Sequence, residues 1–162
     1  MKSIFYYKTI IGEIGIADNG KGITNIYIKD KGKIENDIEI RETKLIKDAI
    51  TQLNEYFSGV RVEFDLALDP GGTEFQNKVW NELSKIPYGE TRAYKEIADN
   101  IGNSKAARAV GMANNKNPIP IIVPCHRVIG KNNSLVGYAG GLEMKLKLLQ
   151  IEGNTSLLNL IK

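Results

Sequence analysis

The segment Asp69-Pro70-Gly71-Gly72 separates two stretches of the chain that have different patterns of apolar residues. Proline fixes its own φ and has no amide hydrogen, and glycine favours turns, so neither a helix nor a strand is expected to continue through this segment. With 162 residues, the chain is long enough for one sizeable core or two small domains. We therefore predict an N-terminal domain over residues 1–70 and a C-terminal domain over residues 71–162.

Short strands and one helix are expected before this boundary. Apolar residues recur at helical spacing from Glu42 to Phe57, and Gly59 is typical of a helix stop. Alternating apolar residues predict a returning strand over Val60–Leu68. Three earlier runs rich in Ile and Tyr, separated by turn residues, are predicted to be strands: Ile4–Thr9, Glu13–Ala17 and Ile23–Lys29. This half is expected to be a small α/β scaffold that carries no chemistry.

The second half is expected to be mostly helical and to contain a winged or helix-turn-helix unit. Thr73 and Gln76 have the spacing of a capping box at the start of its first helix. A second helix is predicted over Tyr94–Ile101, and Ser104 is predicted to cap a third that runs from Lys105 to about Asn114. Two helices joined by a short glycine turn form the helix-turn-helix pattern. The predicted fold class is therefore α/β, of the α+β kind.

The last helix is predicted over Leu142–Ile151, with Leu142, Leu146 and Leu149 as its inward stripe. Glu152 and Gly153 follow it. A carboxylate at the C-terminal end of a helix is unfavourable against the helix dipole. We therefore expect Glu152 to have a compensating role.

The helix predicted after Ser104 carries little bulk. Small residues surround its one long side chain, Arg108: Ala106, Ala107, Ala109, Gly111 and Ala113. Such a helix can approach a groove wall closely, and one arginine among small residues can enter a base stack. The alternative is that the alanines pack against another helix and that Arg108 is solvated.

Composition and charge limit the classes of function. No apolar run approaches the length of a membrane span, and the N-terminus lacks the apolar core of a signal peptide. A single cysteine excludes an intramolecular disulfide and, with a single histidine, a tetrahedral Cys/His zinc set. The net charge is +3, with ten basic and twelve acidic residues over 1–70 but twelve and seven over 71–162. We expect a cytoplasmic protein whose nucleic-acid face, if it has one, is C-terminal.

The only cysteine and the only histidine, Cys125 and His126, stand side by side between two apolar runs. Pro124 prevents the preceding run from continuing as an ordinary strand, so we expect a bend that lifts Cys125 out of a buried strand end. A thiol is a nucleophile only as thiolate, and at a reference pKa of about 8.5 only a few per cent is ionised at neutral pH. A general base is needed, and histidine is suited to that work. The alternative is a small buried thiol beside a surface imidazole.

Neighbouring side chains on an extended strand point to opposite faces. Either the backbone turns at Cys125, or a water molecule carries the proton between thiol and imidazole. A third group from elsewhere in the chain should orient the imidazole. Asn117 precedes a proline, where a turn is favoured, and its side chain can pin such a turn.

The run Pro124-Cys125-His126-Arg127-Val128 resembles the active-site signature of the O6-alkylguanine-DNA alkyltransferases. The resemblance is strong over residues 70–155 and loose before them. Further segments occur in the matching order: Phe75-Gln76 with Val79-Trp80, Ile86-Pro87-Tyr88-Gly89-Glu90-Thr91, Arg108-Ala109-Val110-Gly111, Asn117-Pro118, Gly137-Tyr138-Ala139-Gly140-Gly141 and Glu152-Gly153.

The resemblance implies a stoichiometric reaction with alkylated DNA. Cys125 would attack the alkyl carbon of O6-alkylguanine, or of O4-alkylthymine, and keep the alkyl group, so that each molecule reacts once. His126, oriented by Glu152, would take the thiol proton. Tyr94 would donate a proton to the guanine ring, and Asn117 would brace the active-site turn. No metal or organic cofactor is implied.

The resemblance also implies how DNA is bound. The Ala/Gly-rich helix would enter the minor groove of double-stranded DNA, and Arg108 would replace the nucleotide that is flipped into the pocket. A monomer without an obligate protein partner or a membrane is expected. The residues implied to contact the DNA or the base are Ser104, Ala106, Ala107, Arg108, Ala109, Gly111, Val128, Tyr138, Ala139 and Gly140. The family has Ser or Ala at position 139, so a backbone role is implied there.

Three other functions remain open from the residues. A Cys-His-Glu hydrolase would use the same three groups but would turn over through a hydrolysable thioester. A damage-binding protein of the alkyltransferase-like type would lack the cysteine. A helix-turn-helix regulator that senses alkylation would be expected to dimerise or to carry an effector domain.

Overall fold

The structure is a computed structural model that describes residues 2–28, 37–130 and 141–154. The chain divides into two compact units, Met1–Gly71 and Gly72–Lys162. The division falls within the Asp69-Pro70-Gly71-Gly72 segment. Gly71 and Gly72 both have positive φ, of 68° and 81°, a backbone conformation in which glycine meets no Cβ clash. This pair of glycines marks where the first unit ends.

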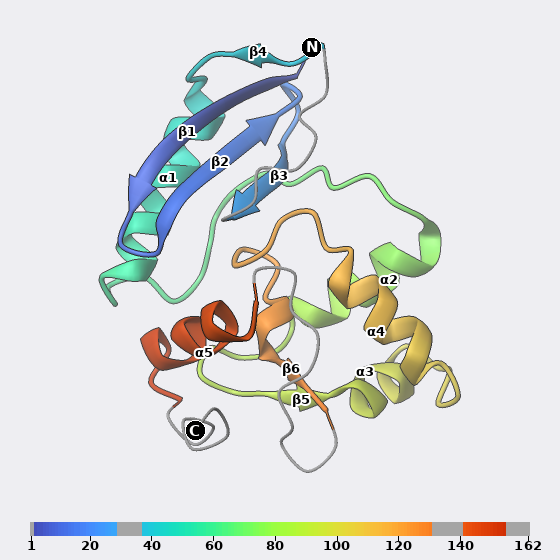
Figure 1. Ribbon diagram of the computed structural model, residues 1–162. Helices are drawn as coiled ribbons and strands as arrows, with labels where there is room; N and C mark the ends of the chain where they lie inside the picture. The colour runs from blue at the N-terminus through green and yellow to red at the C-terminus, as the bar shows by residue number, and fades with distance from the viewer. Residues whose placement is uncertain (1, 29–36, 131–140, 155–162) are drawn as a thin grey trace. The chain divides into compact units, whose positions relative to one another are not determined.

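The N-terminal unit contains a four-stranded sheet in the order β3-β2-β1-β4 (Figure 1). Its strands are β1 (Ser3–Thr9), β2 (Gly12–Asp18), β3 (Ile23–Ile28) and β4 (Glu39–Ile40). The first three form an antiparallel meander, and β4 adds in parallel to β1. Gly15 is needed within β2, because a Cβ there would lie 2.8 Å from the Tyr6 ring. The three strands predicted from runs rich in Ile and Tyr are confirmed, apart from Lys29, which lies outside the described residues, whereas β4 was not predicted.

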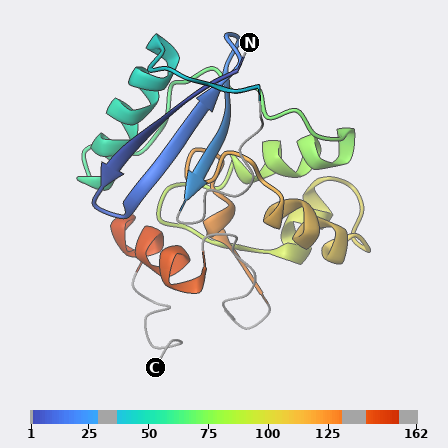
Figure 2. The ribbon, with the colours of Figure 1, turned by 45° about the horizontal axis from the view of Figure 1, so that its top comes forward.

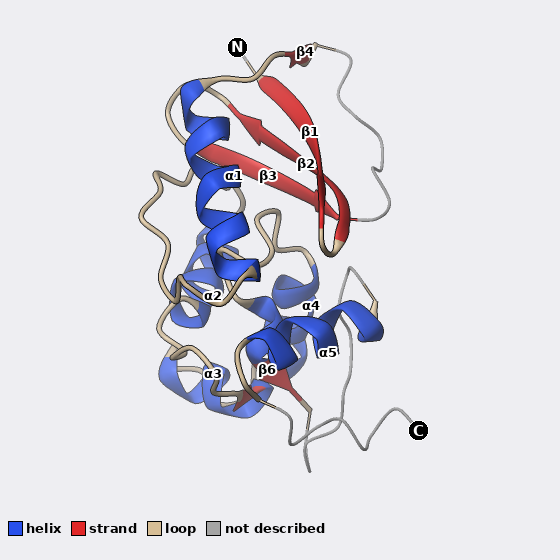
Figure 3. Ribbon diagram, turned by 90° about the vertical axis from the view of Figure 1, so that its left-hand side faces the viewer, coloured by secondary structure: helices blue, strands red, loops and turns tan. Residues whose placement is uncertain are grey.

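One helix, α1 (Lys44–Phe57), packs along the sheet (Figure 3). Thr43 caps it by accepting a hydrogen bond from the Ile46 amide, and Gly59 follows its end with φ of +82°. The inward stripe of α1 and the apolar face of the sheet form the core of this unit, with Ile4, Ile14, Ile16, Ile46, Leu53 and Tyr56 almost fully buried. The predicted helix is therefore confirmed.

The predicted strand over Val60–Leu68 is wrong. The described chain is irregular there apart from a single bridge between Ile23 and Leu68. The Ile23 amide donates to the Ala67 carbonyl at 2.8 Å, and the Asp69 amide donates to the Ile23 carbonyl at 2.8 Å. Val60 and Val62 are 75% and 52% exposed, so the alternating apolar residues do not form one buried face.

The described part of the C-terminal unit contains four α-helices (Figures 1 and 2). They are α2 (Glu74–Leu83), α3 (Tyr94–Asn100), α4 (Ala107–Asn115) and α5 (Leu142–Ile151). A short 3₁₀ helix, η1 (Cys125–Arg127), leads into β6 (Val128–Ile129), which pairs in parallel with β5 (Arg92–Ala93). In both views α5 lies on one side of η1 and β6, and α3 and α4 lie on the other. The predicted mixed class, with a mostly helical second half, is confirmed.

The capping box at Thr73 and Gln76 is confirmed, with both of its hydrogen bonds present. Trp80 on α2 is buried, and its indole Nε1 donates to the Ala113 carbonyl of α4 at 2.9 Å. This bond fixes α4 against α2. No helix in the described part of the chain is long and apolar enough to cross a membrane.

Two details of the predicted helices are wrong. Ser104 is exposed and caps nothing, because the chain first makes a turn in which the Ala106 amide donates to the Asn103 carbonyl at 3.0 Å, and α4 begins only after Ala106. Leu142 does not belong to the inward stripe of α5, since it is 42% exposed at the first position of the helix. The buried face of α5 instead contains Met144, Lys145, Leu146, Leu148 and Leu149.

Candidate active site

The segment before Cys125 is a series of turns, not the predicted strand. The Asn117 side chain spans it: its Nδ2 donates to the Val123 carbonyl at 2.8 Å, and its Oδ1 accepts from the Ile119 amide at 3.0 Å. Ile121, 1% exposed, has a φ of 75°, a left-handed conformation that is rare for a β-branched residue. Sequence patterns could not show this backbone, because apolar residues next to prolines suit a buried strand equally well.

Cys125 lies at the start of η1 and is 3% exposed. The expectation that the bend lifts it out of the interior is therefore wrong. Its amide donates to the Val123 carbonyl at 2.8 Å, and the Arg127 amide donates to the Pro124 carbonyl at 3.0 Å. Of the two arrangements considered from the sequence, the backbone does turn at Cys125.

Glu152 is the centre of a buried polar cluster. It is the C-cap residue of α5 and is 5% exposed. Its Oε2 lies 2.6 Å from His126 Nε2, and the Gly89 amide donates to its Oε1 at 3.1 Å. Arg127 donates to both of its oxygens, from Nε at 2.8 Å and Nη2 at 3.0 Å. These donors offset the unfavourable helix dipole, as the position of Glu152 led us to expect.

The contacts of His126 define its tautomer. A carboxylate can only accept, so the close contact is a hydrogen bond from His126 Nε2–H to Glu152. Nδ1 is then the nitrogen that carries the lone pair. His126 is fully buried, and burial lowers its pKa more than the hydrogen bond to Glu152 raises it. The imidazole is therefore neutral at pH 7 and can accept a proton at Nδ1.

Arg127 and Gly89 belong to this cluster, although neither was assigned a role from the sequence. Arg127 Nη1 also donates to the Ile86 carbonyl at 2.7 Å, and its guanidinium lies 5.8 Å from the centre of the Tyr88 ring. Gly89 has a φ of +82°, and a Cβ there would lie 3.1 Å from the Glu152 carbonyl oxygen. The signal for both was present, because each residue lies within a motif of the resembled family.

Lys145 is a second charged group that the sequence did not reveal. It lies on the inward face of α5, is fully buried, and donates from Nζ to the Val128 carbonyl at 2.5 Å. Burial lowers its pKa from 10.5 to about 8, against the opposing influence of a charge on Cys125. Nothing in the sequence singled out Lys145, which lies between Met144 and Leu146.

Tyr94 and Val128 lie close to Cys125 in the described chain. Tyr94, the first residue of α3, is half-buried, and its pKa is raised by burial and, to a lesser extent, by charge on Cys125. Its hydroxyl is therefore protonated at pH 7 and can donate. Val128 is fully buried in β6.

Helix α4 presents only some of its small residues. Arg108, Ala109 and Met112 are exposed, whereas Ala106, Val110 and Ala113 are buried. Ala107 and Gly111 are partly exposed, and Gly111 lies beside the Tyr94 ring. Arg108 thus lies on an open face that also carries Ala109 and the longer Met112, while Ala106 packs inward. Tyr138, Ala139 and Gly140 lie outside the described residues.

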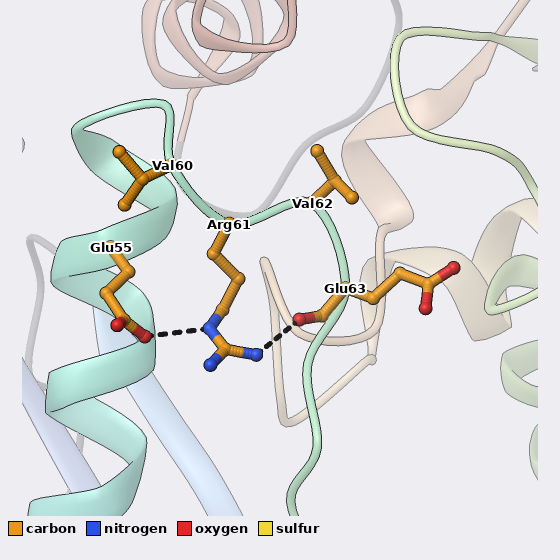
Figure 4. Close-up of a pocket in the computed structure, with 5 residues that line it drawn as sticks. All are labelled: Glu55, Val60, Arg61, Val62 and Glu63. Carbon is orange, nitrogen blue, oxygen red and sulfur yellow. Dashed lines mark hydrogen bonds and ion pairs between the residues drawn. The ribbon is translucent and has the colours of Figure 1, made fainter.

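The N-terminal unit has a shallow hollow of its own, about 320 Å³ in volume (Figure 4). Arg61 lies in its centre, where Nε donates to Glu55 Oε1 at 2.8 Å and Nη1 to the Glu63 carbonyl at 2.8 Å. Val60 and Val62 complete the lining. The Glu55 carboxylate is paired with Arg61, and we assign no chemistry to this hollow.

The fold and the site together define a two-part α+β protein with a helix-turn-helix unit and a buried Cys-His-Glu cluster. Two family models cover nearly all of it. One, described as "6-O-methylguanine DNA methyltransferase, ribonuclease-like domain", matches residues 4–70, and the other, described as "6-O-methylguanine DNA methyltransferase, DNA binding domain", matches residues 74–154. The chain belongs to the 6-O-methylguanine DNA methyltransferase family, as its motifs led us to expect.

Curated relatives and solved structures agree with this assignment. A methylated-DNA–protein-cysteine methyltransferase of Methanosarcina acetivorans is 53% identical over 150 residues, which are 91% of this chain and 96% of the relative. A constitutive protein of the same name from Bacillus subtilis is 47% identical over 156 residues, which are 91% of this chain and 94% of the relative. The crystal structure of Mycobacterium tuberculosis OGT in complex with DNA matches with a TM-score of 0.88 and 44% identity, over 99% of both chains.

Proposed function

We propose that this protein repairs DNA by moving an alkyl group from O6-alkylguanine to Cys125 in a single turnover. O4-alkylthymine is a second candidate substrate. The observation that carries the proposal is the buried Cys125 next to His126, whose Nε2 is held by Glu152 at 2.6 Å so that Nδ1 is the basic nitrogen. The relatives named methylated-DNA–protein-cysteine methyltransferase support it.

The reaction begins with removal of the thiol proton. His126 takes this proton at Nδ1 and becomes an imidazolium that Glu152 stabilises through Nε2–H. The Cys125 thiolate then attacks the alkyl carbon in line, so that the S–C bond forms as the bond from carbon to guanine O6 breaks. Tyr94 donates a proton to the guanine ring nitrogen, which neutralises the leaving group. The thioether has no easy leaving route, so the protein is consumed.

We assign DNA binding to the second unit, residues 71–162, and a scaffold role to residues 1–70. The exposed face of α4, with Arg108 among small residues, suits the wall of the minor groove. Chemistry on a base in a duplex requires that the base be flipped out, and Arg108 would fill the space it leaves. Ser104, exposed in the turn before α4, is suited to a phosphate contact. Monomeric action and a cytoplasmic location stay predictions.

Label transfer tests this function. Protein is incubated with duplex DNA that carries a radiolabelled methyl group on guanine O6, and the label is followed onto protein. We expect transfer to wild-type protein and none to Cys125→Ala, which still binds the DNA. A hydrolase would release the label into solution over many turnovers, and a damage-binding protein would leave it on the DNA.

A further inference from the structure

Two buried polar atoms beside Cys125 have no hydrogen-bond partner within the described residues: Asn114 Oδ1 and His126 Nδ1. Asn114 is 2% exposed and His126 is fully buried. Buried polar groups are almost always hydrogen-bonded, so two such atoms next to a nucleophile require an explanation. Neither the fold nor the reaction described above uses Asn114.

Asn114 is connected directly to the nucleophile. It lies on the buried side of α4, and its Nδ2 donates to the Cys125 carbonyl at 3.4 Å. The carbonyl can only accept, so the nitrogen of the amide faces it and Oδ1 is the atom left over. The nearby Asn117 differs, because both ends of its amide are already used by the turn.

Both unmatched atoms are acceptors. Asn114 Oδ1 is a carbonyl oxygen, and His126 Nδ1 carries a lone pair because Nε2–H is given to Glu152. A water molecule donates two hydrogens and accepts through its oxygen, and buried waters usually make about three hydrogen bonds. Two acceptors and one thiol donor are the set of partners that such a water needs.

We propose that Asn114 is a positioning residue that orients a water molecule between Cys125 and His126, through which the thiol proton reaches the imidazole. The water donates one hydrogen to Asn114 Oδ1 and the other to His126 Nδ1, and its oxygen accepts the Cys125 S–H. In the transfer, the thiol proton moves to the water oxygen as the water gives its own proton to Nδ1. Thiolate, imidazolium and one intact water result. The inference rests on the proposed roles of Cys125 and His126.

The test compares Asn114→Leu, which fills a similar volume, with the matched control Asn115→Leu at the exposed next position. The readout is the rate of Cys125 alkylation by iodoacetamide as a function of pH. We expect Asn114→Leu to lower the rate at pH 7 about tenfold, as loss of an outer-shell partner often does. The midpoint of its pH profile should rise, while the control should match wild type. Asn114→Ala carries the same expectation if the leucine variant does not fold.

Other groups that act electrostatically on Cys125 or His126 are the same in all of these proteins: Tyr94, Arg127, Lys145 and Glu152. A purely structural role for Asn114 would lower the melting temperature and the rate at every pH without moving the midpoint. Such a result would overturn the inference.

A second background gives an independent check. Because Asn114 is proposed to act through His126, Asn114→Leu should not move the midpoint further in a protein that already carries His126→Leu. Additive shifts would contradict the relay. Iodoacetamide needs no DNA, so the inference is judged separately from the proposed function, which instead fails if wild-type protein takes no alkyl group from DNA.

Discussion

At the scale of single residues, the site depends on how one carboxylate is shared. Glu152 accepts from an imidazole, a guanidinium and a backbone amide, all in a buried setting. Arg127 holds the Glu152 carboxylate through both of its oxygens, and the carboxylate keeps the His126 proton on Nε2. Arg127 therefore helps to set the His126 tautomer, although its own charge lowers the pKa of His126.

Replacing Glu152 by Gln should slow alkyl transfer by about 10²- to 10⁴-fold, the usual value of general-base assistance. The amide nitrogen of Gln would face donors, and His126 would adopt the other tautomer, with its lone pair on Nε2. Transfer from O6-benzylguanine as free base measures this rate. The melting temperature is the control for folding. A variant that melts and reacts like wild type would remove Glu152 from the site.

Lys145 should make stability depend on pH in the alkaline range. Its pKa is about 8 in the folded protein and 10.5 when exposed, so between these values the unfolded chain binds more protons and stability rises with pH. The full rise corresponds to roughly 3 kcal/mol. The free energy of unfolding in urea is measured for wild type and Lys145→Met from pH 7 to 10.5. It should rise with pH in wild type relative to the variant. Parallel curves would mean that the pKa of Lys145 is the same in the folded and unfolded protein, so that burial does not lower it.

At the scale of elements, the turn before Cys125 and helix α4 are held by side chains rather than by ladders. Asn117 holds a backbone that includes the left-handed Ile121. Two neighbouring residues near the end of α4 attach it to other elements: the Ala113 carbonyl accepts from Trp80 of α2, and Asn114 donates to the Cys125 carbonyl of η1. The nucleophile is therefore positioned by a few side-chain bonds whose removal can be measured singly.

Asn117→Ala should destabilise the protein by about 1–3 kcal/mol, because it leaves the buried Ile119 amide without its partner and removes one of the two donors to the Val123 carbonyl. Alkyl transfer should also slow, since the turn that presents Cys125 loses its brace. Urea unfolding and single-turnover kinetics measure the two effects, with Asn115→Ala as the exposed control. Wild-type stability in Asn117→Ala would show that the turn is held by other contacts.

Arg108→Ala should weaken reaction with duplex DNA far more than reaction with free O6-benzylguanine. The free base needs no flipping, so an arginine that only fills the vacated stack is dispensable for it. Single-turnover rates on the two substrates give the comparison. Equal losses on both would mean that Arg108 supports the fold or the pocket.

At the scale of the whole molecule, sequence patterns predicted which helices form better than they predicted which distant segments pair. The capping box at Thr73 and the apolar stripe of α1 could be read because each depends on residues within a few positions. The strand over Val60–Leu68 could not, because pairing depends on a distant partner strand. Lys145 was missed for the same reason: a charged residue outside any motif reveals its buried partner only in the fold. Glu152 could be found because its position conflicted with a helix dipole.

The most direct test of the account is the mass of the protein after reaction. Wild-type protein and Cys125→Ser are each incubated with an excess of duplex DNA containing O6-methylguanine, and intact mass and peptide mapping locate any methyl group. The account predicts one methyl per wild-type molecule, on Cys125, with no further repair once the protein is consumed, and none on Cys125→Ser. A methyl group on another residue, or repair of many lesions by each protein molecule, would contradict it.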